Sequence, residues 1–578
     1  MRQWMVAAKK ADFYAIAEKF HVDPVVARII RNREVIGEKN IRIYLGGNLS
    51  DLSDPHQMKD MDRLVEILAQ KIRKQVRIRI IGDYDVDGVT SSHLFLTALR
   101  RVGAKVDVVI PHRIQDGYGL SLHLLQQAKE DGVDTILTCD NGIAAIDEIA
   151  WAKAQKMTVL VTDHHAVPFE EHEGRRTEKK SLADAVVNPH QQDCGYPYKE
   201  LCGAGVAWNV IRVLYENYDM DKREAEDLLD FVAMATVCDV MSLTGENRIL
   251  VKEGLKRIRH TKNIGLQALM QACNVQPENI SAYHFGYVLG PCVNATGRLD
   301  TARHALRLFE TGQETEAEEI ARDLVDLNQE RKELTLQGVE MAKKLCEEGG
   351  YENDPILVLF LPDVHESIAG LIAGRIREMY NRPVFVLTRG EEGVKGSGRS
   401  TENYSMYENM CGCAELFTKF GGHPMAAGLS LPEENVEKFR RKINENCPLT
   451  VEEVCPDIHI DMAMPVGYAS TELVHQFALL EPFGKDNPSP LFADRNLSIS
   501  RMWVIGKNRN VLRMSVLSEY GQPVPVIFFG DVETLFAYFT EKFGQEEVEN
   551  ALHGRKNRIL FSMVYTCLLY TSDAADVV

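Results

Sequence analysis

The chain has 578 residues, a net charge of −18, 45% hydrophobic residues and 26% charged residues. That length exceeds what one hydrophobic core supports, so several domains are expected. The ordinary composition excludes a fibrous or disordered chain, and the acidic balance argues against indiscriminate binding of polyanions. No apolar run reaches the roughly 20 residues of a membrane span, and the start lacks a signal peptide. The twelve cysteines include no Cys-x-x-Cys pair, so we expect a cytoplasmic protein with reduced thiols.

After an N-terminal extension, residues 1–70, the segment 71–250 alternates short apolar strands with amphipathic helices. This alternation predicts an α/β domain with a mostly parallel sheet and helices on both faces. Ligands of such sheets bind beyond the carboxyl ends of the strands. The expected strands are Val76–Ile81, Val106–Ile110, Thr135–Thr138 and Thr158–Thr162, and the expected helices are Thr90–Arg101, Leu122–Glu130 and Ala144–Gln155.

Three further regions follow. Residues 251–350 form a helical connector, because 315–347 is charged, free of proline and periodic in leucine and isoleucine. Residues 351–450 form a second α/β domain, and 456–566 read as a small β-barrel. The expected elements are strand Pro355–Phe360, helix Glu366–Tyr380 and strand Val384–Leu387, then barrel strands Leu497–Val504, Val511–Leu517, Val524–Phe529 and Arg558–Tyr565.

Three carboxylates alternate directly after the first strand: Asp83, Asp85 and Asp87. At about 5 Å, each ionised pair costs on the order of 3 kcal/mol at a surface-like dielectric. A bound cation would offset that repulsion. The alternative is a plain turn followed by a helix cap.

Other polar residues fall at the ends of neighbouring elements. Asp140 follows the third strand, Asp163-His164-His165 follows the fourth, and Asp239 ends a helical run over 225–237. Separately, Asp140 could be a turn residue, the two histidines a buried polar pair, and Asp239 an unfavourable charge at a helix end. Together they predict one metal site.

A site rich in carboxylates favours Mn²⁺ or Mg²⁺ over zinc. Two such ions can clamp a phosphate and activate a water molecule. The reaction class expected from the residues is therefore hydrolysis of a phosphoester or phosphoanhydride.

These four segments resemble the motifs of the DHH phosphoesterase family. Asn294-Ala295-Thr296-Gly297-Arg298, Ser397-Gly398-Arg399-Ser400 and Gly421-Gly422-His423 narrow the resemblance to bacterial exonucleases specific for single-stranded DNA. The resemblance runs from about residue 70 to 566. It implies 5′-to-3′ degradation of single-stranded DNA to mononucleotides in recombination and repair, with two ions of Mn²⁺ or Mg²⁺.

The resemblance also assigns residues. It implies that His165, Asp140 and Asp87 are catalytic, with His165 on the scissile phosphate. The metal ligands would be Asp83, Asp85, Asp87, Asp140, His164 and Asp239, although Asp83 could lie one shell further out. The substrate would contact Arg113, Tyr118, Arg298, Ser397, Arg399 and His423, and the barrel candidates are Trp503, Lys507, Arg509 and Arg513. The alternatives are a structural role for His423, a plain turn at Gly421-Gly422 and an ordinary barrel surface around Trp503.

Two rival functions stay open at this point. One is a DHH phosphodiesterase of short oligonucleotides or cyclic dinucleotides, which generally lacks a barrel. The other is a non-catalytic replication scaffold, which would be expected to lose metal ligands. For the exonuclease we expect a monomer without membrane contact, with a single-strand-binding protein and a helicase as candidate partners.

The segment 567–578 resembles the translation of a sequencing adapter rather than a continued strand pattern. We therefore expect a non-native tail without fixed structure and a barrel truncated near residue 566.

Overall fold

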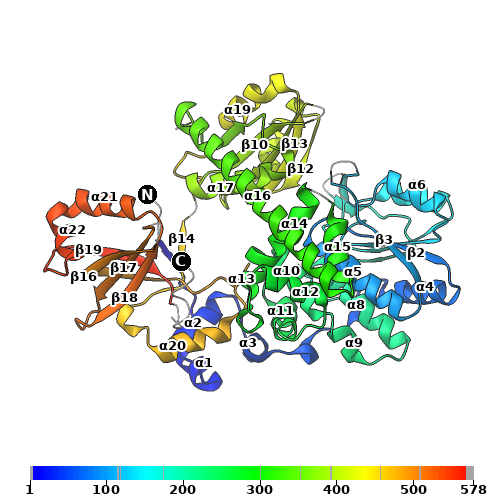
Figure 1. The fold of residues 1–578 in the computed structure, drawn as a ribbon, viewed down its shortest axis with the longest axis horizontal. Coiled ribbons are helices and arrows are strands. Elements are labelled where there is room, and N and C mark those ends of the chain that lie inside the picture. Colours follow the sequence, from blue (N-terminus) through cyan, green and yellow to red (C-terminus); the bar gives the residue numbers. More distant parts are fainter. Residues whose placement is uncertain are drawn as a thin grey trace. The chain divides into compact units, whose positions relative to one another are not determined.

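The computed structural model describes residues 4–113, 116–117, 119–172, 175–299, 301–351, 353–390, 393–455, 457–506 and 509–567. The chain forms two compact units (Figure 1). The larger comprises Gly47–Pro456 with Gly484–Asp486, and the smaller comprises Arg2–Gly46, Asp457–Phe483 and Asn487–Val578. Among the helices described, none combines the length and the apolar character needed to cross a membrane. Tyr118, Lys507 and residues 568–578, most of the expected tail, lie outside the described residues.

The larger unit contains a five-stranded parallel sheet in the order β3-β2-β4-β5-β8. The four strands expected from the sequence are confirmed to within one residue at each end. The fifth was not expected, because three residues carry too short a pattern. The bounds are β2 Arg77–Ile81, β3 Lys105–Val109, β4 Thr135–Cys139, β5 Thr158–Thr162 and β8 Ala185–Val187.

Helices cover both faces of this sheet, as expected. Ile80 and Leu137 point into a core shared with α4 (Met61–Arg73), α5 (Val86–Arg101) and α8 (Gly203–Asn217). Their neighbours Ile81 and Ile136 point to the opposite core, under α6 (Leu122–Glu130) and α7 (Ile146–Ala154). The expected start of α5 at Thr90 is wrong: the helix begins four residues earlier, because Asp85 caps it by accepting the N–H of Gly88 at 3.0 Å.

A helical layer follows the sheet and ends in one long helix. Its members are α9 (Lys222–Glu226), α10 (Leu229–Cys238), α11 (Gly245–Ile258), α12 (Ile264–Ala272), α14 (Gly290–Leu299) and α15 (Ala302–Glu310). The long helix expected over 315–347 is confirmed as α16 (Glu314–Glu348). At 1.5 Å per residue it spans about 50 Å. Ile320 and Leu324 pack into the first core, whereas Val339 and Ala342 pack into the core of the second α/β domain.

The second domain of this unit has a mixed sheet in the order β12-β13-β11-β10-β9. Helices α16 and α17 (Ala369–Tyr380) share the core on one face, whereas α18 (Met406–Cys411) and α19 (Val436–Glu445) contribute to the core on the other. The plain-turn alternative for Gly421-Gly422 is wrong, because both lie in a strand. The bounds are β9 Leu357–Phe360, β10 Val384–Arg389, β11 Val394–Arg399, β12 Lys419–His423 and β13 Ala426–Leu431.

The smaller unit holds the expected C-terminal β-domain as a curled half-barrel sheet. Its strands are β15 (Met462–Ala463), β16 (Phe492–Ile505), β17 (Val511–Leu517), β18 (Pro523–Phe529) and β19 (Leu560–Tyr565). The long β16 pairs with β19 along its first half and with β17 along its second half. Helices α21 (Val532–Phe543) and α22 (Gln545–Leu552), which were not expected from the sequence, separate β18 from β19.

Residues 4–46 belong to the same smaller unit. Helices α1 (Phe13–Phe20), α2 (Pro24–Asn32) and α3 (Glu38–Gly46) share a core with Phe477 and Phe492. Strand β1 (Trp4–Val6) pairs in parallel with β14 (Ile458–Ile460). A buried ion pair between Arg33 and Asp461, at 2.7 Å, links this N-terminal segment to the residue that follows β14.

Candidate metal centre and substrate site

The four acidic and histidine segments converge at one edge of the parallel sheet. Strands β2, β4 and β5 are neighbours, and their carboxyl ends lead into Asp83–Asp87, Asp140 and Asp163–His165. Asp239 arrives from the C-terminal end of α10. Nε2 of His164 lies 3.1 Å from Oδ1 of Asp140, 3.5 Å from Oδ2 of Asp239 and 3.7 Å from Oδ2 of Asp87.

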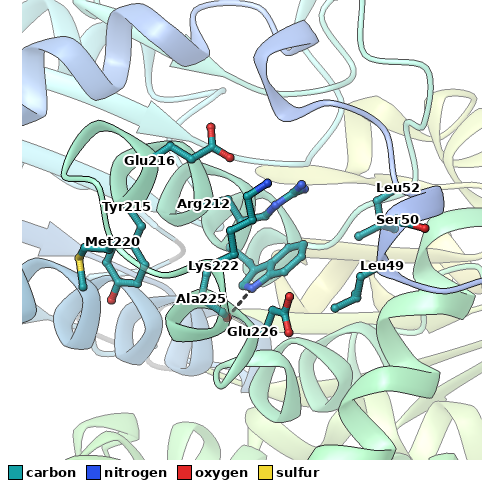
Figure 2. A pocket seen from close by; sticks show the side chains of 11 residues that line it. Leu49, Ser50, Leu52, Arg212, Tyr215, Glu216, Met220, Lys222, Ala225 and Glu226 are labelled. Carbon is teal, nitrogen blue, oxygen red and sulfur yellow. Dashed lines mark hydrogen bonds between the residues drawn. The ribbon is translucent and has the colours of Figure 1, made fainter.

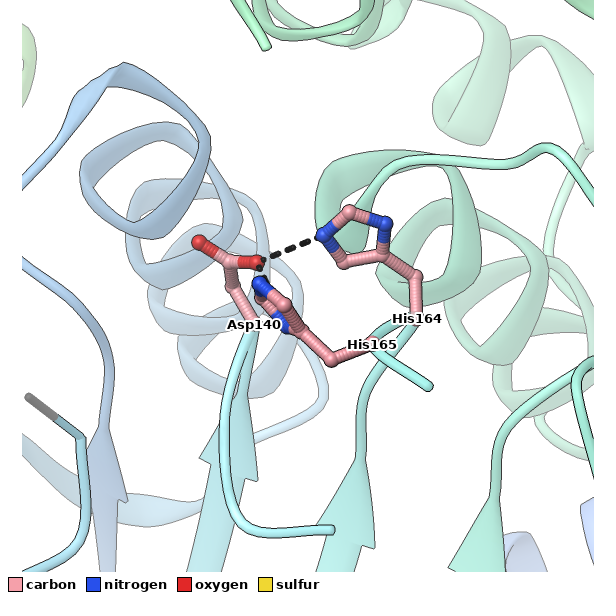
Figure 3. Close-up of side chains that lie close together, drawn as sticks. All are labelled: Asp140, His164 and His165. Atoms are coloured by element: carbon pink, nitrogen blue, oxygen red, sulfur yellow. Dashed lines mark ion pairs between the residues drawn. The ribbon is translucent and has the colours of Figure 1, made fainter. Parts of the chain in front are cut away.

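These side chains form three overlapping groups whose ligand atoms lie within 4.8 Å of one another. They are Asp83, Asp85 and Asp140; Asp87, His164 and Asp239; and Asp140, His164 and His165. Figure 3 shows both imidazoles directed at the carboxylate of Asp140. Because the groups share Asp140 and His164, these residues could together hold two neighbouring ions.

Backbone amides fix the orientation of Asp87. Its Oδ2 accepts the N–H of Gly203 at 2.6 Å, and its Oδ1 accepts the N–H of Ala204 at 2.7 Å. Both donors belong to the first turn of α8, where the helix dipole favours an anion. Sequence reasoning missed these two residues, and the signal that could have found them is the run of small residues over 203–207.

Asp163 orients the neighbouring histidines. Its Oδ1 lies 2.8 Å from Nδ1 of His165 and accepts the N–H of His164 at 2.7 Å, while its Oδ2 accepts the N–H of Ile143. Burial lowers the pKa of His165, but the hydrogen bond to Asp163 and the negative charges of Asp163, Asp239 and Asp87 together outweigh it and raise the pKa to about 9. His165 therefore carries a proton at neutral pH and presents a positive charge beside the cluster.

The electrostatics of the cluster call for a cation. Burial, and then the charge of neighbouring carboxylates, raises the pKa of Asp83, Asp85, Asp140 and Asp239. Burial lowers the pKa of His164, which keeps its imidazole neutral, the form that ligates metals. Such a set of carboxylates can ionise together only with compensating positive charge.

Two buried atoms without hydrogen-bond partners among the described residues show that the acidic cluster could hold a metal ion. Oδ1 of Asp83 and Nε2 of His164 have no hydrogen-bond partner within the described part of the chain. The donor set is mostly carboxylate oxygen with one or two imidazoles, which matches Mn²⁺ or Mg²⁺. Asp85 does cap a helix, and Asp140 does sit in a turn with φ 62°, but neither role explains why these acids are gathered together.

Three arginines form a second cluster in the same unit. Arg113 follows β3 and stacks on the ring of Tyr84 at 4.9 Å. Nη1 of Arg298 donates to the carbonyl of Ser367 at 2.7 Å, and Nη1 of Arg399 donates to that of Gly398. Burial, and then the charges of Arg113 and other arginines, lowers the pKa of Arg298 to about 10. Three guanidinium groups close enough to repel one another favour a bound anion such as phosphate.

The remaining predicted substrate residues lie on one face of the second sheet. Ser397 and Arg113 line a cavity of about 420 Å³. Arg399 pairs with Ala426, which pairs in turn with His423, so these three share a face of the sheet with Ser397. Ser367 and Ala369, at the N-terminus of α17, line the same cavity, where the dipole of α17 adds positive potential.

The predicted barrel residues are partly brought together. Trp503 of β16 pairs directly with Arg513 of β17, whose guanidinium lies 6.0 Å from the indole ring. Arg501, which sequence reasoning missed, lies closer, at 4.9 Å. Arg509 occupies the turn between these strands.

A separate cavity of about 360 Å³ lies along α8 and α9 (Figure 2). Trp208 forms part of its wall and donates its Nε1–H to the carbonyl of Ala225 at 2.7 Å. The lining contains none of the residues predicted for the metal or the substrate.

Family models match three parts of the chain. The model for the DHH family, N-terminal domain, matches residues 77–236, the DHHA1 domain matches 353–447 and the RecJ OB domain matches 460–565. The chain thus combines the DHH and DHHA1 domains of a DHH protein with an additional C-terminal domain.

Named relatives narrow the class. The single-stranded-DNA-specific exonuclease RecJ of Haemophilus influenzae is 34% identical over 518 residues, 86% of this chain and 88% of that protein. RecJ of Bacillus subtilis is 33% identical over 88% of this chain, which spans 63% of the length of that relative. The crystal structure of RecJ in complex with Mn²⁺ from Thermus thermophilus has a TM-score of 0.75 at 27% identity, covering 90% of this chain and 74% of that one. The chain belongs to the RecJ family.

Proposed function

We propose that this protein is a metal-dependent exonuclease that hydrolyses single-stranded DNA from the 5′ end to mononucleotides in recombination and repair. The observation that carries the proposal is the presence, in one unit, of an acidic cluster suited to two divalent ions and of an arginine cluster suited to a terminal phosphate. The relatives named above are single-stranded-DNA-specific exonucleases by name, and a related structure is a complex with Mn²⁺.

In this proposal the acids and His164 hold two ions of Mn²⁺ or Mg²⁺: Asp83, Asp85, Asp87, Asp140, His164 and Asp239. When bound, such ions supply a nucleophilic water and neutralise charge on the scissile phosphate. The amides of Gly203 and Ala204 keep Asp87 oriented, and the protonated imidazole of His165 contacts a non-bridging oxygen of the scissile phosphate. Asp163 keeps that proton in place.

The arginine cluster accounts for attack from an end. Arg113, Arg298 and Arg399, with Ser397, hold the terminal 5′-phosphate, and His423 contacts phosphate on the same face. A strand fixed by its terminal phosphate presents the next phosphodiester to the acidic cluster, so that each cleavage releases one nucleotide. The assignment of Tyr118 to the path of the strand remains a sequence prediction.

Product analysis on end-labelled strands tests the proposal. A 5′-phosphorylated single strand with Mn²⁺ or Mg²⁺ should yield labelled mononucleotide from the first time point, and a duplex of the same sequence should not be degraded. A dinucleotide or cyclic dinucleotide consumed faster than the long strand would instead support the small-substrate alternative. No hydrolysis and no binding of Mn²⁺ at micromolar concentration would support the scaffold alternative.

We further infer a cytoplasmic monomer with a single-strand-binding protein and a helicase as partners, because unwound, protein-coated strands are the form in which such a substrate arises. In this assignment the catalytic domain is 71–250, the connector 251–350, the DHH-associated domain 351–450 and the oligonucleotide-binding domain 456–566. Size measurement in solution and copurification test these points.

A further inference from the structure

Two cysteines lie side by side at the end of α12 and the start of α14. Sγ of Cys273, which directly follows α12, is 3.8 Å from Sγ of Cys292 in the first turn of α14. Both are free thiols; Cys273 is partly exposed, whereas Cys292 is 2% exposed. Because the sulfurs of a disulfide are about 2.05 Å apart, the two thiols need to approach by a further ~1.8 Å to be joined.

The surroundings of the pair give its two thiols different reactivity. The thiolate is the form of cysteine that reacts with oxidants, and nearby positive charge favours it. The hydrogen bond with Cys292 lowers the pKa of Cys273, and the charge of Lys332 in α16 lowers it further, against the opposing effect of burial. The same hydrogen bond, and then burial, raise the pKa of Cys292. Cys273 is therefore the thiol that meets an oxidant first, and Cys292 is the shielded partner that can close a disulfide.

Cys292 also belongs to a buried polar chain that leads toward the arginine cluster. Asn328 of α16 is 4% exposed, donates from Nδ2 to Sγ of Cys292 at 3.4 Å and accepts with Oδ1 from Nη2 of Arg331 at 2.8 Å. The charge of Arg331 is one of those that lower the pKa of Arg298. A Cys292 sulfur that turns toward Cys273 leaves the buried amide of Asn328 without this acceptor. Because an unsatisfied buried amide is costly, Asn328 and Arg331 must then reorient.

The helix α14 itself touches both predicted sites. Oδ1 of Asn294 accepts the N–H of Val86, the first residue of α5, at 3.1 Å. Gly297 packs on the backbone of Tyr84, because a Cβ atom at this glycine would lie 2.4 Å from the Tyr84 carbonyl oxygen. Arg298 of the same helix belongs to the arginine cluster. A shift at the start of α14 therefore reaches both the loop that carries the predicted metal ligands and the predicted phosphate pocket.

We propose that Cys273 and Cys292 form a peroxide-sensitive dithiol, and that its oxidation to a disulfide slows the hydrolysis of single-stranded DNA. The effect on hydrolysis rests on the proposed function, whereas formation of the disulfide does not. The disulfide ties the end of α12 to the start of α14 and withdraws Cys292 from Asn328. In a reducing compartment such a bond is transient, which suits a redox signal rather than a permanent cross-link.

The oxidation balances with one molecule of hydrogen peroxide. The Cys273 thiolate attacks one peroxide oxygen, the O–O bond breaks, and hydroxide leaves a sulfenic acid on Cys273. The sulfur of Cys292 then attacks the sulfenic sulfur, the S–S bond forms, the S–O bond breaks, and the hydroxyl group leaves as water with the proton of Cys292. The two thiols lose two electrons and two protons, and the peroxide becomes two water molecules. A thiol reductant reverses the step by thiol–disulfide exchange.

Peptide mapping and a rate measurement on the full chain test the dithiol. The chain is oxidised without metal by a small molar excess of hydrogen peroxide, the peroxide is removed with catalase, and free thiols are alkylated before digestion and mass spectrometry. A peptide cross-linked through Cys273 and Cys292 should appear, and dithiothreitol should remove it. After addition of Mn²⁺, the oxidised chain should hydrolyse a 5′-phosphorylated single strand about tenfold more slowly than the reduced chain, because small misplacements of reacting groups cost at least this much.

Three variants separate this pair from the other thiols. Cys273→Ser keeps a small polar group at a partly exposed position, so its rate should match that of the reduced, unaltered chain and should not fall after peroxide. Cys273→Ala should give the same two results without a hydroxyl group at the end of α12. Cys411→Ser, which removes an exposed thiol of α18, should still form the cross-link and should slow as the unaltered chain does.

Absence of the cross-link between Cys273 and Cys292 under conditions that oxidise Cys411 would overturn the proposal. A cross-linked chain that keeps the rate of the reduced chain would overturn it as well, and so would an equal loss of rate in Cys273→Ser after peroxide. Failure of the proposed function would be distinct: the reduced, unaltered chain would not hydrolyse single strands. In that case the peptide map still decides whether the two thiols form the disulfide.

Discussion

The backbone N–H of Gly203 donates to Oδ2 of Asp87 over 2.6 Å, and the same residue packs directly against Asp140. A Cβ atom at Gly203 would lie 2.6 Å from the Cβ of Asp140, closer than carbon atoms can approach. Residue 203 thus touches two predicted ligands at once, from a helix that follows them by more than sixty residues of sequence.

Gly203→Ala should therefore damage the metal site without unfolding the domain. The added methyl must displace Asp140 or tilt the amides from Asp87, and the loss of such support typically costs 10-fold to 100-fold in metal affinity. Titration calorimetry with Mn²⁺ measures the effect. Gly374→Ala, in α17 with nothing within 4 Å of the added atom, is the matched control and should bind Mn²⁺ normally. Unchanged Mn²⁺ affinity in Gly203→Ala would show that α8 does not support the metal ligands.

Asp140→Asn should abolish hydrolysis while single-strand binding stays within a few-fold. Asparagine tolerates the left-handed backbone found at this position, φ 62°, but it removes the negative charge of a predicted ligand. Rate measurements on a labelled strand should show a loss of more than about 100-fold. If binding disappears together with activity, and the melting temperature falls, the residue is an element of the fold instead.

Arg399→Ala should reduce the preference for 5′-phosphorylated ends by about tenfold, because it removes one of the three guanidinium groups that we propose hold the terminal phosphate. The ratio of kcat/KM for 5′-phosphorylated and 5′-hydroxyl strands measures this preference. Arg441→Ala, in α19, serves as the control and should keep the ratio of the unaltered chain. An unchanged ratio in Arg399→Ala would remove this arginine from the pocket.

His93 makes the stability of the folded chain depend on pH in the acidic range. Its ring lies 4.5 Å from Phe231, its Nδ1 has no hydrogen-bond partner among the described residues, and burial lowers its pKa to about 3. The unfolded chain binds a proton below pH 6.5 and the folded chain does not, so stability falls as the pH falls from 6.5 toward 3. Between pH 7 and pH 5 the loss from this residue is about 2 kcal/mol.

His93→Phe keeps the aromatic packing and should remove that part of the acid sensitivity. Urea unfolding of the larger unit at pH 7 and pH 5 compares the two chains. The variant His260→Gln changes an exposed histidine and is the control for the loss of any one histidine. An identical loss on acidification in His93→Phe and the unaltered chain would show that His93 does not cause it.

The elements that the sequence predicted best are those with a strong local pattern. Thr158–Thr162 is a β-branched strand with the bounds expected, and α16 was recognised from 315–347 because its apolar period is long. The start of α5 was predicted four residues too late because Asp85 was interpreted as a metal ligand. In the structure Asp85 also caps the helix, which begins at Val86. The strands β11 and β12 contain glycines at positions where side chains normally signal a strand.

The candidate site was predictable where residues follow strand ends, and not where contacts depend on tertiary packing. Asp140 and His164 meet because β4 and β5 are neighbours, a consequence of parallel-sheet topology. The amides of Gly203 and Ala204 reach Asp87 only because α8 packs against α5. No local pattern in residues 83–88 encodes that approach.

The helix α16 contributes side chains to the core beneath the predicted metal ligands and to the core beneath the predicted phosphate pocket. A continuous helix cannot change length by half a residue, and each inserted residue would turn everything beyond it by about 100°. We therefore expect α16 to keep the predicted metal ligands and the predicted phosphate pocket at a constant separation, which an inserted residue would change.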